Sequence, residues 1–109
     1  MKRTLRFGLA IAVALISSGQ APEIDRRVRI VNDSKQAIVG FYGANVTVRE
    51  WRESLLGDGT LPPGASVVLD FEDGSGYCRF RFRAVFDDGM DLVRESVNVC
   101  EVGTYRYTD

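Results

Sequence analysis

The two cysteines of this chain enclose the stretch that most constrains its fold. From Tyr77 the sequence alternates apolar and basic residues, turns at 87–89 (Asp-Asp-Gly) and returns through a valine-rich segment to Cys100. Alternation with a period of two is typical of a half-buried strand, and Asp-Gly is a strong hairpin signal. Residues 77–100 are therefore predicted to form an antiparallel β-hairpin that carries a cysteine at each end.

The strand predicted over 77–86 has two chemically different faces. One face carries the apolar residues Cys78, Phe80, Phe82, Ala84 and Phe86, and the other carries Arg79, Arg81 and Arg83. In the return strand, Val93, Val97 and Val99 share one parity, whereas Cys100 has the opposite one. A β-bulge near 95–98 would bring both the valines and Cys100 opposite the apolar face.

The first 21 residues have the form of a signal peptide. Basic residues (Lys2, Arg3, Arg6) precede a short apolar run over 7–16, and small residues follow at 17–21. The apolar run is shorter than the ~20 residues that a membrane-spanning helix needs. We expect a periplasmic or secreted protein with no stable membrane insertion after signal cleavage. In an exported small domain, an even number of cysteines predicts a structural disulfide, here between Cys78 and Cys100.

The remainder, 22–109, is predicted to be a single β-rich domain. Residues 28–31 and 37–42 are expected to pair as antiparallel strands joined by 32–36, and further strands are expected at 66–71 and 104–108, the last at a sheet edge. Thr47 and Glu50 have the spacing of a capping box, with Val46 and Trp51 as a hydrophobic staple, so a short helix is expected over 46–57. The fold class is mainly β: a small antiparallel β-sandwich or curled sheet of about six strands, one short helix and one disulfide.

Composition excludes several classes of function. Removal of Lys2, Arg3 and Arg6 takes the 14 basic residues to 11, against 15 acidic ones. An acidic domain is a poor partner for nucleic acid. The chain has no histidine, and its serines lack the sequence context of an activated nucleophile. We therefore expect a non-catalytic protein without a cofactor, a catalytic residue or a metal ligand, and rank a small enzyme as the weakest alternative.

The row Arg79, Arg81 and Arg83 is the candidate ligand surface. Guanidinium groups ~6.6 Å apart along a strand can bind carboxylates of an acidic glycan or an envelope protein. The alternative is a solvent-exposed face whose arginines pair across the sheet with Glu95 or another acid. Trp51 is interpreted as a core aromatic of the staple rather than a ligand-stacking platform.

Two acidic stretches suggest a different class, a calcium-stabilised module. Glu72 and Asp73 lie before the hairpin, and Asp87, Asp88 and Asp91 lie at its tip. Calcium prefers carboxylate oxygens in flexible loops, although neither stretch has the spacing of an EF-hand loop. The two stretches are expected at opposite ends of the 77–86 strand. Such a module should melt at a higher temperature with calcium than with a chelator.

Several motifs together resemble a family of small exported bacterial proteins. These are Trp51 followed by Leu55-Leu56-Gly57, then Leu61-Pro62-Pro63-Gly64, then Cys78, the run 84–89 (AVFDDG) and Cys100. The resemblance spans most of the predicted domain and implies a small exported fold. Its motif positions are structural residue types, so it implies no functional residues. The leading hypothesis is an exported, non-catalytic binding or structural module of the bacterial periplasm or envelope.

Overall fold

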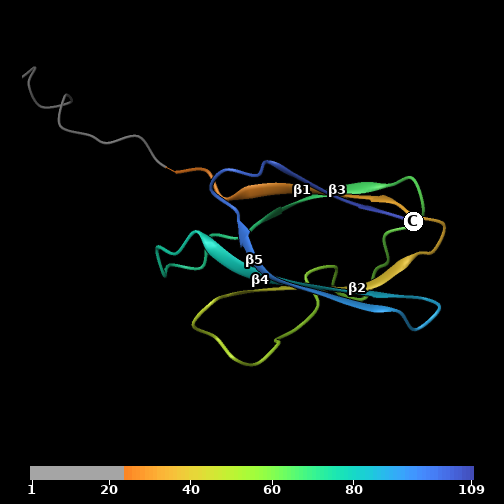
Figure 1. Ribbon diagram of the computed structural model, residues 1–109, viewed down its shortest axis with the longest axis horizontal. Helices are drawn as coiled ribbons and strands as arrows, with labels where there is room; N and C mark the ends of the chain where they lie inside the picture. Colours follow the sequence, from red (N-terminus) through yellow and green to blue (C-terminus); the bar gives the residue numbers. More distant parts are fainter. Residues whose placement is uncertain (1–23) are drawn as a thin grey trace, which may run out of the picture.

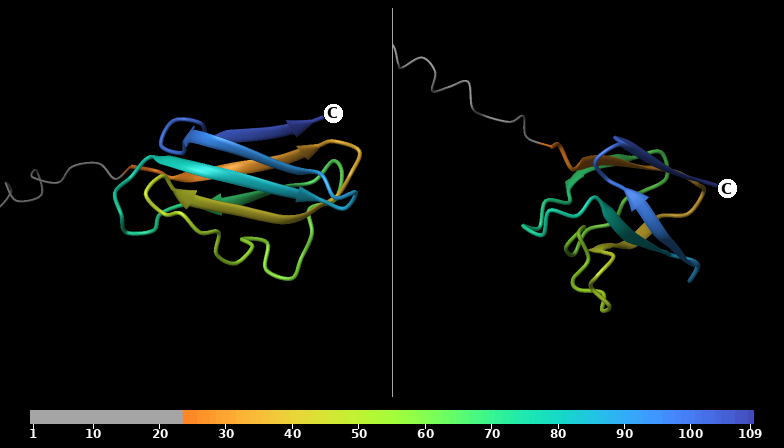
Figure 2. Two further views of the ribbon diagram at one scale, coloured as in Figure 1. Left: turned by 60° about the horizontal axis from the view of Figure 1, so that its bottom comes forward. Right: turned by 60° about the vertical axis from the view of Figure 1, so that its left-hand side comes forward.

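The computed structural model describes residues 24–109, which form two three-stranded β-sheets packed face to face (Figure 1). The strands are β1 (Arg27–Asp33), β2 (Ile38–Asn45), β3 (Ser66–Asp70), β4 (Arg79–Phe86), β5 (Asp91–Asn98) and β6 (Thr104–Thr108). Sheet A has the strand order β3-β1-β6, and sheet B has the order β2-β4-β5. The mainly β fold of about six strands is confirmed as a two-layer sandwich (Figure 2). The predicted signal peptide lies outside the described residues.

β1 is the central strand of sheet A. It pairs antiparallel with β3 and parallel with β6, which confirms the edge position predicted for 104–108. Val28 and Ile30 are fully buried, whereas Arg27 and Arg29 are exposed on the opposite face. The alternation that marks β1 in the sequence therefore separates the core from solvent.

β1 and β2 do not pair with each other, so the predicted antiparallel pair over 28–42 is wrong. The corner between the two sheets forms at Asn32, whose side chain is fully buried. Its Nδ2 donates to the carbonyls of Gln36 (2.8 Å) and Leu61 (2.9 Å), and its Oδ1 accepts from the backbone N–H of Ser34 (3.0 Å). These hydrogen bonds stabilise the bend at which the chain crosses from sheet A to sheet B. The apolar faces of β1 and β2 then bury each other.

Aromatic rings from both sheets fill the core. Phe41 of β2 contacts Phe82 of β4 and Tyr107 of β6, with ring centres 5.2 and 6.2 Å apart. Phe71, directly after β3, stacks on Phe82 at 4.9 Å. A Cβ at Gly43 would lie 2.5 Å from the Phe71 ring, so only glycine fits there. Edge-to-face and stacked pairs of this kind add to the stabilisation from burial.

The predicted hairpin is present as β4 and β5, with its apolar face in the core. Phe80 lies opposite Val97, but Phe82 lies opposite Arg94, so one extra residue of β5 is accommodated across from Arg81. The predicted bulge is thereby confirmed. It brings Val97 and Val99 into the core, but Val93 lies opposite Arg83 on the outer face, so the shared face predicted for the three valines is wrong.

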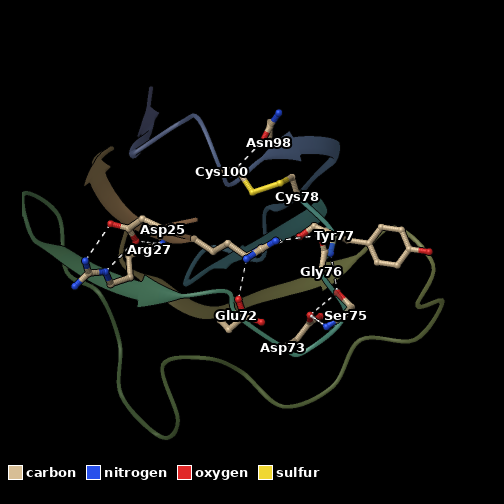
Figure 3. Close-up of a disulfide and its surroundings, with 11 residues drawn as sticks. Asp25, Arg27, Glu72, Asp73, Ser75, Gly76, Tyr77, Cys78, Asn98 and Cys100 are labelled. Atoms are coloured by element: carbon tan, nitrogen blue, oxygen red, sulfur yellow. Dashed lines mark hydrogen bonds and ion pairs between the residues drawn. A yellow bond between two sulfur atoms is a disulfide. The ribbon is translucent and has the colours of Figure 1, made fainter. Parts of the chain in front are cut away.

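The disulfide between Cys78 and Cys100 is confirmed, with a Cα–Cα distance of 5.3 Å (Figure 3). Cys78 precedes β4 and Cys100 follows β5, so the bond closes the open end of the hairpin. Beside it, the N–H of Val99 donates to the carbonyl of Cys78 at 2.9 Å. A structural disulfide is typical of an oxidising, extracytoplasmic compartment.

The predicted helix over 46–57 is wrong, because this segment forms turns and bends. Its polar groups form hydrogen bonds with the free edge of β2 instead of the hydrogen bonds of a helix. The N–H of Leu55 donates to the carbonyl of Phe41 (2.7 Å), and the N–H of Phe41 donates to Ser54 Oγ (3.1 Å). Thr47, the predicted helix cap, donates its hydroxyl to Asn45 Oδ1. Covering a sheet edge here outweighs the local helical preference.

Residues 24–109 contain no helix that is long and apolar enough to cross a membrane.

Candidate functional site

The alternation of β4 directs its three arginines to the outer face of sheet B. Phe80, Phe82 and Ala84 between them are buried, so the strand is anchored by its inner face. Arg79 is exposed, whereas Arg81 and Arg83 are half-buried. The structure thus places the three predicted residues on one rigid surface, but gives each a different environment.

Arg81 is held by the segment that follows β2. Its Nη2 donates to the carbonyls of Val48 (2.5 Å) and Arg49 (3.0 Å). Its guanidinium carbon lies 4.4 Å from the centre of the Trp51 ring, within the range of a cation–π interaction. Arg81 therefore fixes residues 48–51 against the sheet, and its charge is turned toward protein atoms.

Trp51 lies on this outer face, so its predicted place in the core is wrong. Its ring is half-buried and lies 6.4 Å from the ring of Tyr42, tilted by 58°. Because the hydrophobic staple depended on a helix that does not form, the indole packs on β2 and β4 from outside. A planar ring is left at the surface, as the interpretation of Trp51 as a stacking platform requires.

Arg83 is paired with Asp91 of β5. Nε and Nη2 donate to both carboxylate oxygens, at 2.8–3.2 Å. The hydrogen bonds from Arg83 lower the pKa of Asp91, against a smaller opposing effect of burial. The guanidinium also lies 5.2 Å from the centre of the Tyr42 ring. The alternative interpretation, cross-strand pairing with an acid, is correct for this arginine, and the acid is Asp91.

Arg79 is the most accessible to a ligand of the three arginines. Its one polar side-chain contact in the described part of the chain is a long one, 3.4 Å to Ser96 Oγ. Within residues 24–109, no carboxylate lies within ion-pair distance of Arg79 or Arg81. Arg79 and Arg81 therefore keep a positive charge that no carboxylate of the described residues neutralises, whereas the charge of Arg83 is neutralised by Asp91.

Tyr42 is a member of this surface that sequence reasoning missed. It lies opposite Arg83 in the pairing of β2 with β4, and its ring covers Gly40, where a Cβ would lie 2.9 Å from the tyrosine hydroxyl. Its position in the strand could have revealed this: Phe41 is apolar and points inward, so its neighbour Tyr42 points outward. We call the set Tyr42, Trp51, Arg79, Arg81 and Arg83 the arginine–aromatic face.

The acidic loops lie at opposite ends of β4, as expected, since 72–76 precedes the strand and 87–90 follows it. Their carboxylates have partners within the fold. Glu72, which Figure 3 shows, pairs with Arg26 at 2.8 Å. Asp73 accepts from Asn45 at 2.9 Å, and Asp88 accepts from the N–H of Met90 at 3.0 Å. Among residues 24–109, no group of three or more His, Cys, Asp or Glu side chains could hold a metal ion.

A cleft of about 500 Å³ between 48–55 and 73–75 is lined by two acids, Glu53 and Asp73. Burial raises the pKa of Asp73, but hydrogen bonds from Ser75 and Asn45 outweigh it, so that the pKa lies below its ordinary value. A carboxylate held ionised in this way is a poor proton donor. Arg52 lines the same cleft.

Comparisons of the chain with models of known protein families, with curated proteins and with solved structures gave no match.

Proposed function

We propose that this chain is an exported, non-catalytic binding module of the bacterial periplasm or envelope, and that its ligand is an acidic glycan bound on the arginine–aromatic face. Export is supported by the signal-peptide pattern of residues 1–21 and by the disulfide between Cys78 and Cys100. The single observation that carries the ligand class is the placement of two planar rings among three guanidinium groups on one sheet face.

Each part of this face suits one part of a glycan that carries carboxylates. The rings of Trp51 and Tyr42 offer flat apolar surfaces for the faces of sugar rings, and both are half-buried and fixed by neighbours. Arg79 offers an exposed guanidinium, which binds a carboxylate in a charge-assisted, two-pronged geometry. Aromatic side chains that their neighbours already hold in place lose little conformational entropy when they bind.

Sheet B provides a stiff platform for this face. Residues inside it, Phe80, Phe82 and Ala84, are at most 2% exposed, so the outward side chains between them are held at fixed spacing. Arg81 contributes by holding residues 48–51, and with them Trp51, in place. In this proposal Arg79, Tyr42 and Trp51 contact the ligand, and Arg81 holds Trp51 in position. Arg83 is partly neutralised by Asp91.

The test is binding of the oxidised protein to polygalacturonate, with neutral dextran for comparison, by affinity electrophoresis and calorimetry. Arg79→Glu should weaken binding about tenfold or more, since a charge-assisted hydrogen bond contributes about 1.5–3 kcal/mol. Tyr42→Ala should weaken it as well. The matched control is Arg29→Glu, the same charge change on an exposed residue of sheet A.

An equal loss with Arg29→Glu would show that binding depends on overall charge, and would contradict a site on sheet B. Absence of binding to any carboxylate-bearing polysaccharide would contradict the glycan proposal. In that case, capture of an acidic envelope protein that depends on Arg79 would keep the surface and change the partner.

A further inference from the structure

Sheet B has one covered edge and one open edge. At the β2 edge, Ile38 and Leu61 exchange backbone hydrogen bonds of 2.9 and 2.8 Å, and Leu55 donates to Phe41 at 2.7 Å. At the β5 edge, residues 91–96 are all exposed. Within residues 24–109, no segment makes backbone hydrogen bonds along the outer side of 91–96, and only the carbonyl of Asn98, at the end of β5, accepts from the N–H groups of Glu101 and Val102. Proteins usually cover or shorten such edges, because they offer a template for another strand.

The register of the hairpin shows which backbone groups are free. The N–H of Phe86 donates to the carbonyl of Met90 at 2.8 Å, so this is a hydrogen-bonded pair. In an antiparallel ladder such pairs alternate with non-bonded ones, and Leu92 and Arg94, opposite Ala84 and Phe82, therefore direct their backbone groups at β4. The N–H and C=O groups of Asp91 and Val93 point away from the sheet.

Exposed apolar side chains accompany these free groups. Met90, Leu92 and Val93 are 53%, 43% and 46% exposed. Leu92 also lines two hollows. One of about 290 Å³ lies between β5 and β6 beside Tyr105, and one of about 330 Å³ beside Met90 lies between the hairpin tip, the turn at 34–36 and the end of β6. Apolar surface gathered at an unpaired strand edge is the composition of a protein–protein contact.

We infer that the β5 edge binds a second copy of this chain, strand to strand and antiparallel, about a two-fold axis at Leu92. In that register Asp91 lies opposite the second copy's Val93, and both residues direct their free backbone groups at each other. Two such pairs form, one on each side of the axis, and the two Leu92 side chains meet at the closely spaced, non-hydrogen-bonded position.

The charges on this edge favour a second copy over an unrelated strand. Arg94 has no carboxylate within ion-pair distance in the described residues, and Asp87 and Asp88 at the hairpin tip have no cationic partner there. Antiparallel pairing about Leu92 sets Arg94 opposite the other copy's Met90, next to its acidic tip. The arrangement repeats on both sides of the axis, so the edge is complementary to itself.

The bulge limits the length of the pairing, and the two-fold symmetry limits the association to two copies. It interrupts β5 at 95–96, so that regular pairing extends only over the preceding residues. A two-fold contact uses the same patch on both chains and leaves no further β5 edge free, which closes the assembly. The two outer faces of sheet B would lie side by side on one surface, doubling the length of the arginine–aromatic face.

The test is the mass of the oxidised protein in solution, measured by analytical ultracentrifugation over a range of concentrations. We expect twice the mass of one chain. Val93→Pro removes an outward N–H at an edge position that tolerates proline, and Leu92→Lys places a charge at the axis, so both should yield monomers. The matched control is Val68→Lys, a residue 46% exposed on β3, which should leave the dimer intact.

Charge reversal supplies a second measurement that does not depend on backbone changes. Arg94→Asp should weaken the dimer, and the double variant with Asp87→Arg should restore it. Circular dichroism checks that each variant keeps its β content. A wild-type protein that stays monomeric up to its solubility limit, or a folded Val93→Pro variant that still dimerises, would overturn the inference.

Discussion

The guanidinium carbon of Arg81 lies 4.4 Å from the centre of the Trp51 ring. This contact joins β4 to the segment 46–57, which is predicted from the sequence to be a helix. It also reverses the roles predicted for the two residues. The arginine, a candidate ligand residue, holds backbone carbonyls of the segment. The tryptophan, a predicted core residue, lies on the surface that a ligand would meet.

Replacing Arg81 by methionine should loosen residues 48–51. The variant loses two hydrogen bonds from a charged donor and a cation–π contact, so we expect the free energy of unfolding to fall by about 1–3 kcal/mol. Urea denaturation measures this change. Trp51 is the only tryptophan in the chain, so its fluorescence should shift to the red before unfolding begins. Arg79→Met is the control, and an equal response of both variants would contradict the role given to Arg81.

Arg26 and Arg27 are neighbours that should respond very differently to substitution. The Arg26 side chain is 9% exposed and donates to Glu72 and to the carbonyls of Gly76 and Tyr77. Arg26→Met leaves these acceptors unpaired and should cost about 3 kcal/mol. The Arg27 side chain is 63% exposed, so Arg27→Met should change stability by less than about 0.5 kcal/mol. Thermal and urea unfolding compare the two, and similar losses would contradict this account of the Arg26 contacts.

Asn32 should be the least replaceable polar residue of the corner. Asn32→Asp removes both N–H donors to Gln36 and Leu61 and buries a carboxyl group beside two carbonyl oxygens. We expect a loss of about 3 kcal/mol or more, with a larger loss at neutral than at acidic pH, where the aspartate is protonated. Ser34→Ala, the control, removes one neighbouring hydroxyl and should cost about 1 kcal/mol. Urea midpoints of both variants, measured at neutral and at acidic pH, test this expectation.

Stability should fall as the pH drops below about 4. The pKa of Asp91 is lowered by Arg83, and that of Asp25 is lowered to about 2 by Arg27. A carboxyl group with a depressed folded-state pKa stabilises the fold above its unfolded pKa of about 3.9, and this contribution is lost as the pH falls through the folded-state value. Asp91→Asn should flatten the acid limb of a plot of melting temperature against pH. An unchanged limb would contradict a role for this pair.

Removing the disulfide should destabilise the domain without changing its strand pairing. The bond joins residues 22 positions apart, and the loop-entropy relation gives about 3 kcal/mol for a closure of this length. The double variant Cys78→Ala and Cys100→Ala should therefore lower the urea midpoint while keeping the circular dichroism of the native fold. Reduction of the wild-type protein should have the same effect. A loss of β content before denaturant is added would show that the bond is needed to form the hairpin.

Local patterns predicted the hairpin well, because its signals are carried by neighbouring residues. The alternation of 79–86, the Asp-Gly turn and the parity of Cys100 together required a bulge in the return strand, and Phe82 opposite Arg94 confirms it. The same reasoning failed at 46–57. Thr47 and Glu50 satisfy a local capping pattern, but the free edge of β2 competes for Ser54 and Leu55 and prevents a helix.

The candidate site was predicted in part. Parity placed Arg79, Arg81 and Arg83 on one face, but it could not show that Asp91 neutralises Arg83 or that Tyr42 and Trp51 join them, since those contacts depend on which strands are neighbours.

The sequence by itself determined a disulfide-closed hairpin, a mainly β domain and the two faces of β4, because alternation and turn chemistry act over a few residues. The tertiary structure alone decided that β1 and β2 belong to different sheets and that β1 pairs in parallel with β6. Those choices depend on burial of apolar faces from distant parts of the chain, and on a buried Asn32 whose partners, Gln36 and Leu61, are brought together only by the folded corner.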